Sequence, residues 1–339
     1  MSPFFDFILT AFALGMTFLY GCTGEILTEK AGHLNLGIPG IMCVGGACGC
    51  TAIRMFYQTG MPGFFVVLIG IVAAFIGGAI MGLIYCLLTV TLKANQNVTG
   101  LAMTTFGVGL TKFIMVKMAD VSMEYLYAID YFRFPFASKT NALNACGSMM
   151  FLAIIIALLA SYTLSRTKVG LHLRAVGENP ATADAVGINV TRYKYGATLI
   201  GSGIAALGGL YYIMDISGTF EAYKTIEPLG WLAVALVIFT LWKPHFSIVG
   251  SFVFGLLYLL GMKISVSMKM TPLLQTIPYV VTVIVLIITS VKKKRENQPP
   301  HHSVFPISER KDDRLLLKFF GEVRRGFSVF YRNLQEGFK

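Results

Sequence analysis

The polar side chains that could contact a small solute in this sequence are mostly neutral amides and hydroxyls. Asn95, Gln96 and Thr99 follow directly on a long apolar run. Amide and hydroxyl groups at the mouth of such a run can hydrogen-bond the hydroxyls of a ribose or another sugar without adding charge. A local interpretation is at least as strong, in which Asn95 or Asn97 caps the start of a helix.

A second polar segment, residues 25–42, breaks the apolar pattern near the beginning of the chain. Asn35, Gly37, Pro39 and Gly40 would interrupt a helix close to its start. At membrane depth, non-helical backbone survives only where it is buried in protein or lines a watery cavity, and broken helices form many transporter sites. An ordinary turn in the cytoplasm explains the same residues equally well.

The third polar stretch, residues 165–194, is a basic island between two long apolar runs. Asn179 and Pro180 are the residue types expected at the N-cap and the first position of a helix, and Gly187 stands where a helix C-terminal glycine would stand. A membrane protein that keeps a short, capped helix in a basic loop presents that helix to the cytoplasm.

Catalytic, nucleotide-binding and metal-binding patterns are missing from the sequence. No GxxxxGK[ST] phosphate loop is present, because residues 107–112 have the wrong spacing and lie in an apolar run. The six cysteines lie in or beside apolar runs and lack the paired spacing of a metal site, so they are expected to pack between helices. We therefore expect no catalytic residue, no metal and no cofactor in this chain, which is not expected to be an enzyme.

Long apolar helices must position these residues. Hydrophobic residues make up 55% of the chain and charged residues 13%, against about 25% charged in soluble domains. Runs long enough to cross a hydrocarbon core of about 30 Å recur along the sequence. The predicted spans are residues 7–24, 36–53, 64–92, 98–118, 146–164, 195–214, 229–242, 246–261 and 272–291. The sequence therefore predicts an all-α, polytopic membrane protein with about nine transmembrane helices, some of them broken or re-entrant.

The distribution of basic residues sets the expected orientation. The cluster at residues 292–295 and the basic island at 165–194 both belong in the cytoplasm by the positive-inside rule, and four spans separate them. The N-terminus is then outside, the C-terminus is in the cytoplasm, and residues 119–144 face outward. Lys112 and Lys117, near the outer end of the fourth span, fit less well. The first run is expected to be a retained span, since no basic residue precedes it.

Apart from these edge lysines, the nine runs as bounded above contain no charged residue. Ion-coupled transporters usually keep ionisable groups within the membrane to relay or coordinate the ion. A transporter with a neutral core needs energy from another protein, so the sequence argues against a secondary transporter. Glycines cluster within the runs, at residues 45–46, 77–78, 201, 203 and 208–209. Such small residues let helices approach closely and predict a compact bundle.

Residues 296–339 differ in composition from the rest of the chain. A linker with two prolines and two histidines precedes apolar residues at three- and four-residue steps, namely Leu316, Phe320, Val323, Phe327, Phe330, Leu334 and Phe338. Basic residues occupy the other faces, which predicts a basic amphipathic helix. It could lie on an anionic inner leaflet or pack against a partner. The expected domains are a transmembrane domain, residues 1–295, with a cytoplasmic loop at 165–194, and this tail.

The polar segments together resemble the permease subunits of ABC importers for simple sugars, nucleosides and branched-chain amino acids. The first matches ER-x-G-x-x-N-[IL]-G-x-E-G-x-M, with Lys30 and Pro39 as departures, and residues 94–102 resemble N-[EQ]-V-x-x-G-L-A with one extra residue. Residues 170–188 are very close to G-x-x-x-R-A-x-G-[ED]-N-x-x-A-A-x-x-x-G-I, and shorter matches lie at 230–236 and 242–244. The form of the first motif is most like the nucleoside branch.

This resemblance implies a role for each polar segment. In the family the 165–194 loop forms coupling helices that dock into a groove on a cytoplasmic ATPase. The residues that would couple to the ATPase are Arg174, Gly177, Glu178, Asn179, Pro180, Ala183 and Gly187. The residues that would line the translocation pathway are Asn35, Gly37, Gly40, Asn95, Gln96 and Thr99. ATP and Mg would be bound by the partner ATPase, not by this chain.

The resemblance also implies partners and a location. A second permease subunit, most often a different chain, the ATPase and an extracytoplasmic substrate-binding lipoprotein or soluble receptor would complete the importer in a bacterial plasma membrane, in contact with lipid and without nucleic acid. The expected function is to form half of the pathway for a nucleoside, purine or pyrimidine. A simple sugar such as ribose or galactose is the alternative cargo, and a membrane scaffold that moves no solute is the alternative class.

Overall fold

The structure is a computed structural model, and it describes residues 3–57, 59–117, 147–217, 223–263 and 276–292. The chain divides into two compact units, residues 1–303 and 304–339. The second unit, the predicted tail helix, the outward loop at 119–144 and the basic cluster at 293–295 lie outside the described residues. Everything below concerns the first unit.

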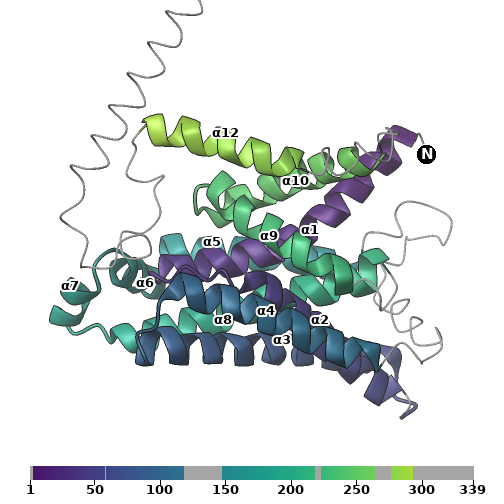
Figure 1. The fold of residues 1–339 in the computed structure, drawn as a ribbon, viewed down its shortest axis with the longest axis horizontal. Coiled ribbons are helices and arrows are strands. Elements are labelled where there is room, and N and C mark those ends of the chain that lie inside the picture. Colours follow the sequence, from purple (N-terminus) through teal and green to yellow (C-terminus); the bar gives the residue numbers. More distant parts are fainter. Residues whose placement is uncertain (1–2, 58, 118–146, 218–222, 264–275, 293–339) are drawn as a thin grey trace, which may run out of the picture. The chain divides into compact units, whose positions relative to one another are not determined.

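The described elements are all helical. In order they are α1 (Pro3–Lys30), α2 (Ile38–Tyr57), α3 (Gly63–Cys86), η1 (Leu87–Thr91), α4 (Gln96–Val116), α5 (Ser148–Arg166), α6 (Lys168–Glu178), α7 (Pro180–Ala185), α8 (Val190–Tyr211), η4 (Tyr212–Ser217), α9 (Tyr223–Phe239), α10 (Pro244–Lys263) and α12 (Ile277–Lys292). Here η1 and η4 are π-helical continuations of α3 and α8. Figure 1 shows these helices as one bundle, in which α1 runs from the N-terminus toward the end where α6 lies.

Seven helices within the described residues are long and apolar enough to cross a membrane. They correspond to the first six predicted spans and the eighth. The helices at the seventh and ninth positions, α9 and α12, have 17 and 16 residues. The chain is thus a polytopic helical membrane protein. The count of nine spans and the orientation remain predictions.

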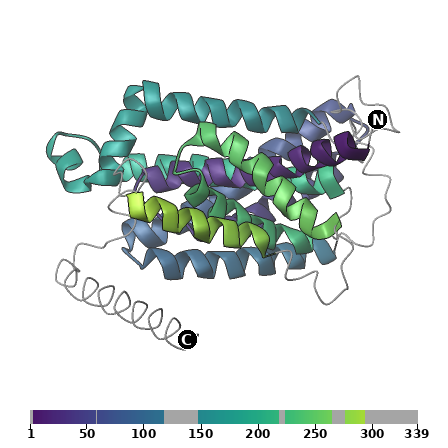
Figure 2. The same cartoon turned by 90° about the horizontal axis from the view of Figure 1, so that it is seen from above.

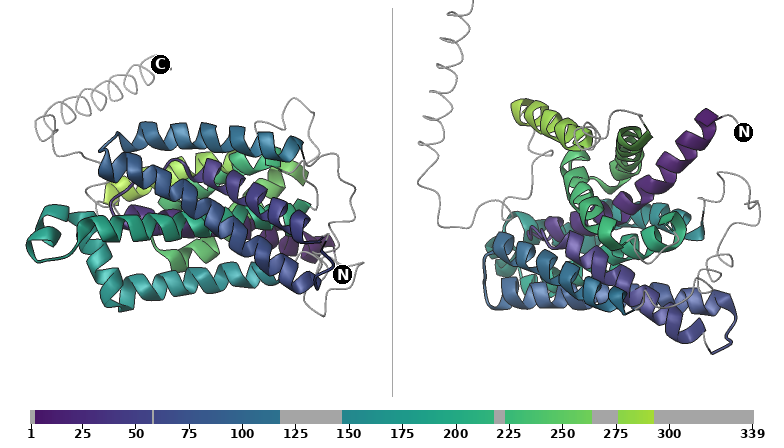
Figure 3. Two further views of the ribbon diagram at one scale, coloured as in Figure 1. Left: turned by 90° about the horizontal axis from the view of Figure 1, so that it is seen from below. Right: turned by 45° about the vertical axis from the view of Figure 1, so that its right-hand side comes forward.

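Helix α8 packs against α1, α2 and α3, and it lies beside α3 in Figures 1 and 3. Of the 18 consecutive residues that make the span at 190–217 apolar, 83% are buried inside the protein. Glycine permits this approach, as the sequence predicts: a Cβ on Gly78 or Gly45 would run into the backbone or side chain of α8, and one on Gly209 would overlap the Met42 carbonyl. Elsewhere, large apolar side chains on α3 and α5, such as Phe65, Ile76 and Leu158, are exposed as a lipid-facing surface would require.

Two predicted span boundaries differ from the helices by six residues, more than the other boundaries within the described residues. The first predicted span ends at residue 24, but α1 continues to Lys30 and includes Glu25 and Glu29. The seventh is predicted to begin at residue 229, but α9 begins at Tyr223 and contains Pro228 within the helix. Both errors arise at a residue type that usually ends an apolar helix. In α1 the two acids are accommodated by hydrogen bonds from the Asn35 backbone amide and the Trp242 indole, and a proline within a membrane-spanning helix is tolerated.

Candidate functional site

Helices α6 and α7 form a short, capped unit between α5 and α8. The Thr167 hydroxyl accepts a hydrogen bond from the Gly170 amide at the start of α6 (3.1 Å), and the Asn179 side chain accepts one from the Thr182 amide at the start of α7 (3.1 Å). Pro180 occupies the first turn of α7, and Gly187 has a φ of 84°, which favours glycine. The predicted capped helix at 179–187 is therefore confirmed. Figure 2 shows this unit extending past the ends of the long helices.

One face of α6 is closed against the bundle. Leu173, Val176 and Gly177 are buried, and a Cβ on Gly177 would clash with the Lys30 carbonyl at the end of α1. Glu178 attracts the Lys30 ammonium electrostatically, while Arg174 repels it. The α6 helix therefore lies directly on the last turn of α1, and this region is called the α6 end of the bundle below.

The other face of this unit is open. Val169, Leu171 and Val186 are 62%, 58% and 71% exposed, which is high for apolar side chains on a polar loop. Arg174 and Glu178 are exposed beside them. Ala183 is different: it is 2% exposed and buried within the chain itself, so any effect it has on a partner must come through the shape of the loop. An apolar patch with charged neighbours on a rigid loop has the composition of a protein docking surface.

The break between α1 and α2, residues 31–37, is non-helical and largely buried, so it is not an exposed turn. Backbone groups of this break form hydrogen bonds with side chains that are distant in the sequence. The Leu34 carbonyl accepts from the Tyr85 hydroxyl (2.7 Å), the Leu34 amide donates to the Gln96 side chain (3.0 Å), and the Leu36 carbonyl accepts from the Thr104 hydroxyl (2.7 Å). Helices α3 and α4 therefore fix the position of this loop.

Asn35 is fully buried at the centre of the loop. The Asn35 backbone amide donates a hydrogen bond to the Glu25 carboxyl (2.8 Å), and the Asn35 side-chain oxygen accepts one from the Gly37 backbone amide (3.0 Å). A Cβ on Gly37 or Gly40 would press into the backbone or side chains of α4 near Met103. These glycines allow the loop and the start of α2 to lie against α4.

Asn95 is the N-cap of α4, and its side chain accepts from the Asn97 and Val98 amides at 3.0 and 3.2 Å. The local, capping interpretation of this residue is confirmed. Thr99 is 7% exposed in the first turn of α4. The structure thus brings Asn35, Gly37, Gly40 and Gln96 into contacts between the loop, the start of α2 and α4, while Asn95 and Thr99 lie in the cap and first turn of α4 beside Gln96. Asn35, Asn95 and Gln96 use side-chain oxygens there to bond the backbone.

Two buried carboxyls were missed by the sequence analysis. Glu25 and Glu29 lie one turn apart on α1 and are 0% and 2% exposed. Glu29 accepts a hydrogen bond from the indole nitrogen of Trp242, and Glu25 accepts the Asn35 amide described above. The predicted first span ends before both of them, so the helix bundle contains two buried carboxyls that the apolar runs did not predict. The signal available in the sequence was the four-residue spacing of the two acids directly after an apolar run, which places both on one helix face.

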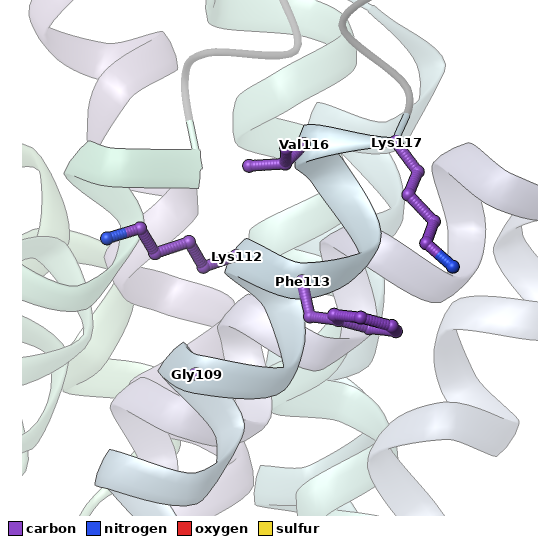
Figure 4. A pocket seen from close by; sticks show the side chains of 5 residues that line it. All are labelled: Gly109, Lys112, Phe113, Val116 and Lys117. Carbon is purple, nitrogen blue, oxygen red and sulfur yellow. The ribbon is translucent and has the colours of Figure 1, made fainter.

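At the opposite end of α4, Lys112 and Lys117 border a shallow hollow of about 400 Å³ (Figure 4). Gly109, Phe113 and Val116 complete its lining among the described residues, and the Lys117 ammonium lies 4.6 Å from the centre of the Phe113 ring. The hollow is mainly apolar, and it lies away from the α6 end. No group of three or more His, Cys, Asp or Glu residues that could hold a metal occurs in the described part of the chain.

The fold and the α6 end define a class: a multi-span helical membrane protein that presents a capped, partly apolar unit beyond its bundle. Comparison with known proteins makes the class specific. Residues 5–290 match the family of branched-chain amino acid transport system permease components. The chain belongs to this family of ABC transporter permeases, and it is a multi-pass protein of the bacterial plasma membrane.

Three relatives illustrate the range of named substrates. The chain is 31% identical to the nucleoside ABC transporter permease NupC of Lactococcus lactis, over 80% of this chain and 87% of that protein. It is 27% identical to the guanosine ABC transporter permease NupQ of Bacillus subtilis, over 76% and 81%. It is 30% identical, over 79% and 87%, to TsgC13 of Haloferax volcanii, whose name assigns it provisionally to an ABC transporter for glucose.

Proposed function

We propose that this permease forms half of the translocation pathway for a nucleoside in an ATP-driven importer. The observation that carries the proposal is the 31% identity to a nucleoside permease across 80% of the chain. The guanosine permease NupQ supports it independently. The proposal implies a second permease subunit, a cytoplasmic ATPase that binds ATP and Mg, and an extracytoplasmic substrate-binding protein.

In this proposal α6 and α7 are the coupling helices. The exposed side chains Leu171 and Val186 would enter a groove on the ATPase, with Arg174 and Glu178 making charged contacts at its rim. Asn179, Pro180 and Gly187 would keep the unit rigid, and Gly177 would keep it close to α1. A capped helix fixed on one side is suited to passing on a displacement, because it moves as a unit.

The pathway residues remain part of the proposal. Asn35, Gly37, Gly40, Asn95, Gln96 and Thr99 would control the opening between the loop at 31–37 and α4 at the cytoplasmic end. The hydrogen bonds that the Leu34, Asn35 and Gly37 backbone amides make support a role for this loop as a plug more than as an open cleft, because these groups are already paired. Residues 1–295 would form the permease domain and residues 296–339 a cytoplasmic tail.

A simple sugar is the second candidate cargo, because the identity to TsgC13 is 30% over a similar share of the chain. A nucleoside contains a ribose, so the two candidates share the hydroxyl chemistry that amide side chains recognise. Only the nucleoside carries a purine or pyrimidine base, so binding of the base would distinguish the two cargoes.

The test is transport by the assembled complex in sealed vesicles. With ATP on the ATPase side, we expect accumulation of labelled inosine or cytidine, competed by other nucleosides and unaffected by dissipating ion gradients. Uptake of ribose or glucose without nucleoside uptake would select the sugar alternative. An ATPase-active complex with its binding protein that moves neither class of solute would contradict the proposal.

A further inference from the structure

The contact between Glu29 and Trp242 joins two parts of the permease that are 213 residues apart in sequence. Glu29 is 2% exposed and Trp242 is 7% exposed, so the hydrogen bond is shielded from water. Removing one partner of a buried polar pair leaves the other without compensation, which makes such a contact costly to break. Glu29 lies on the last turn of α1, one residue before the contact with α6.

Trp242 lies in the tight turn between α9 and α10, and the backbone of this turn is strained. Leu241 and Trp242 have φ values of 54° and 57°, in the left-handed region that side chains rarely adopt. Two such residues in succession persist only where the surroundings fix them. The Trp242 amide also bonds the Val237 carbonyl (3.2 Å), and Thr240 lies 3.8 Å from the Cys22 sulfur on α1. Contacts with α1 therefore help to hold this turn.

A continuous series of contacts leads from the coupling unit to the pathway region. Gly177 of α6 abuts the Lys30 carbonyl, Glu29 bonds Trp242, and α9 leads from that turn back to Gly230, where a Cβ would overlap Pro39 at the start of α2. Glu25, one turn before Glu29, holds the loop at 31–37 through Asn35. Both carboxyls thus lie between the docking surface and the residues proposed to gate the pathway.

We propose that the Glu29–Trp242 contact transmits displacement of α6 to α9 and α10, and that Glu29 and Trp242 are positioning residues of the transport cycle. The inference rests on the proposed function. A movement of α6 driven by the ATPase would shift the last turn of α1, and the buried hydrogen bond would carry the turn at 240–243 with it. Without that bond, the α9–α10 turn would follow the last turn of α1 less closely, because the remaining contacts between α1 and this turn, such as Cys22 with Thr240, lie nearer the start of α1.

Replacing Trp242 by phenylalanine tests this, because an aromatic ring, smaller than the indole, remains and the N–H donor is lost. In the complete complex we expect solute moved per ATP hydrolysed to fall about tenfold. ATPase activity and the KM for the solute would stay near wild type. Trp231, the other tryptophan of the chain, lies half-buried on α9. The matched change Trp231→Phe should leave the ratio unchanged.

A second pair of variants separates coupling from folding. Glu29→Gln keeps an oxygen that accepts the indole N–H and should retain most of the coupling, whereas Glu29→Leu removes the acceptor and should uncouple as Trp242→Phe does. Equal coupling in the Gln and Leu variants, or wild-type coupling in Trp242→Phe, would overturn the inference. So would loss of ATPase activity together with transport, since that marks a structural defect. The wild-type complex tests the proposed function separately, because its own failure to transport would refute the function and not the contact.

Discussion

At the residue scale, Gly177 decides how closely α6 approaches α1. Alanine at this position would bring its Cβ against the Lys30 carbonyl, so we expect Gly177→Ala to lower stability by about 1–3 kcal/mol. Helix propensity alone would predict the opposite sign, since alanine is favoured over glycine by about 1 kcal/mol. The measurement is the thermal unfolding midpoint of the purified protein in detergent, which should fall by several degrees for this size of change.

Gly196 supplies the control for that change. It also lies in a helix, but a Cβ there would meet nothing within 4 Å. Gly196→Ala should therefore leave the midpoint unchanged or raise it. If both variants shift the midpoint equally, the close contact between α6 and α1 is not a determinant of stability.

Single residues differ in how well the sequence alone predicts them. Asn179, Pro180 and Gly187 act within one turn of their own positions, so residue type and spacing were enough. Glu29 could not be placed in the same way, because its partner Trp242 is distant in sequence and an acid after an apolar run normally marks a helix end. For Asn35 and Gln96, the sequence offered a buried loop as one of two alternatives. It could not name the hydrogen-bond partners of that loop, because they come from α1, α3 and α4.

At the scale of elements, α7 has six residues and depends on its cap. Asn179→Ala removes the acceptor for the Thr182 amide and should destabilise α7 by about 1 kcal/mol. Hydrogen exchange of the amides at 182–187 should then be about fivefold faster, with no change in α8. Asn179→Asp keeps the acceptor and should exchange like wild type. Unchanged exchange in the alanine variant would show that packing, not the cap, holds α7.

Helix positions followed from the apolar runs, while some helix ends did not. The start of α4 is set by Asn95 and the start of α8 by Asn189, whose side chain accepts from the Arg192 amide (2.9 Å), both of them local signals. Helix α9 instead contains Pro228 and begins six residues before the predicted span. Within a bundle, neighbouring helices can satisfy the backbone groups that a proline frees. A single run of sequence does not contain that information.

At the scale of the whole molecule, the tail should be separable from the bundle. Residues 296–339 differ in composition from the rest of the chain, and the linker at 298–302 has the polar, proline-containing composition of a domain boundary. A chain truncated after Arg295 should reach the membrane in amounts within about twofold of the full chain, because the packing that folds a bundle lies within it. Membrane-fraction immunoblotting and gel filtration in detergent measure this. Failure of the truncated chain to insert would make the tail part of the folding unit.

The predicted orientation of the bundle in the membrane rests on one physical rule, and labelling two positions tests it. The positive-inside rule places α6 and α7 in the cytoplasm, and α4 then ends outside, which leaves Lys112 and Lys117 on the side where basic residues are less common. Val186 is 71% exposed on the loop after α7, and Lys117 is exposed after α4.

In a cysteine-free background, Val186→Cys should react with a membrane-impermeant maleimide only after the cells are opened. Lys117→Cys should react in intact cells. The reverse pattern would invert the topology and place the coupling unit where no ATPase could reach it, whereas the expected pattern would show that the two lysines are retained outside against the charge rule.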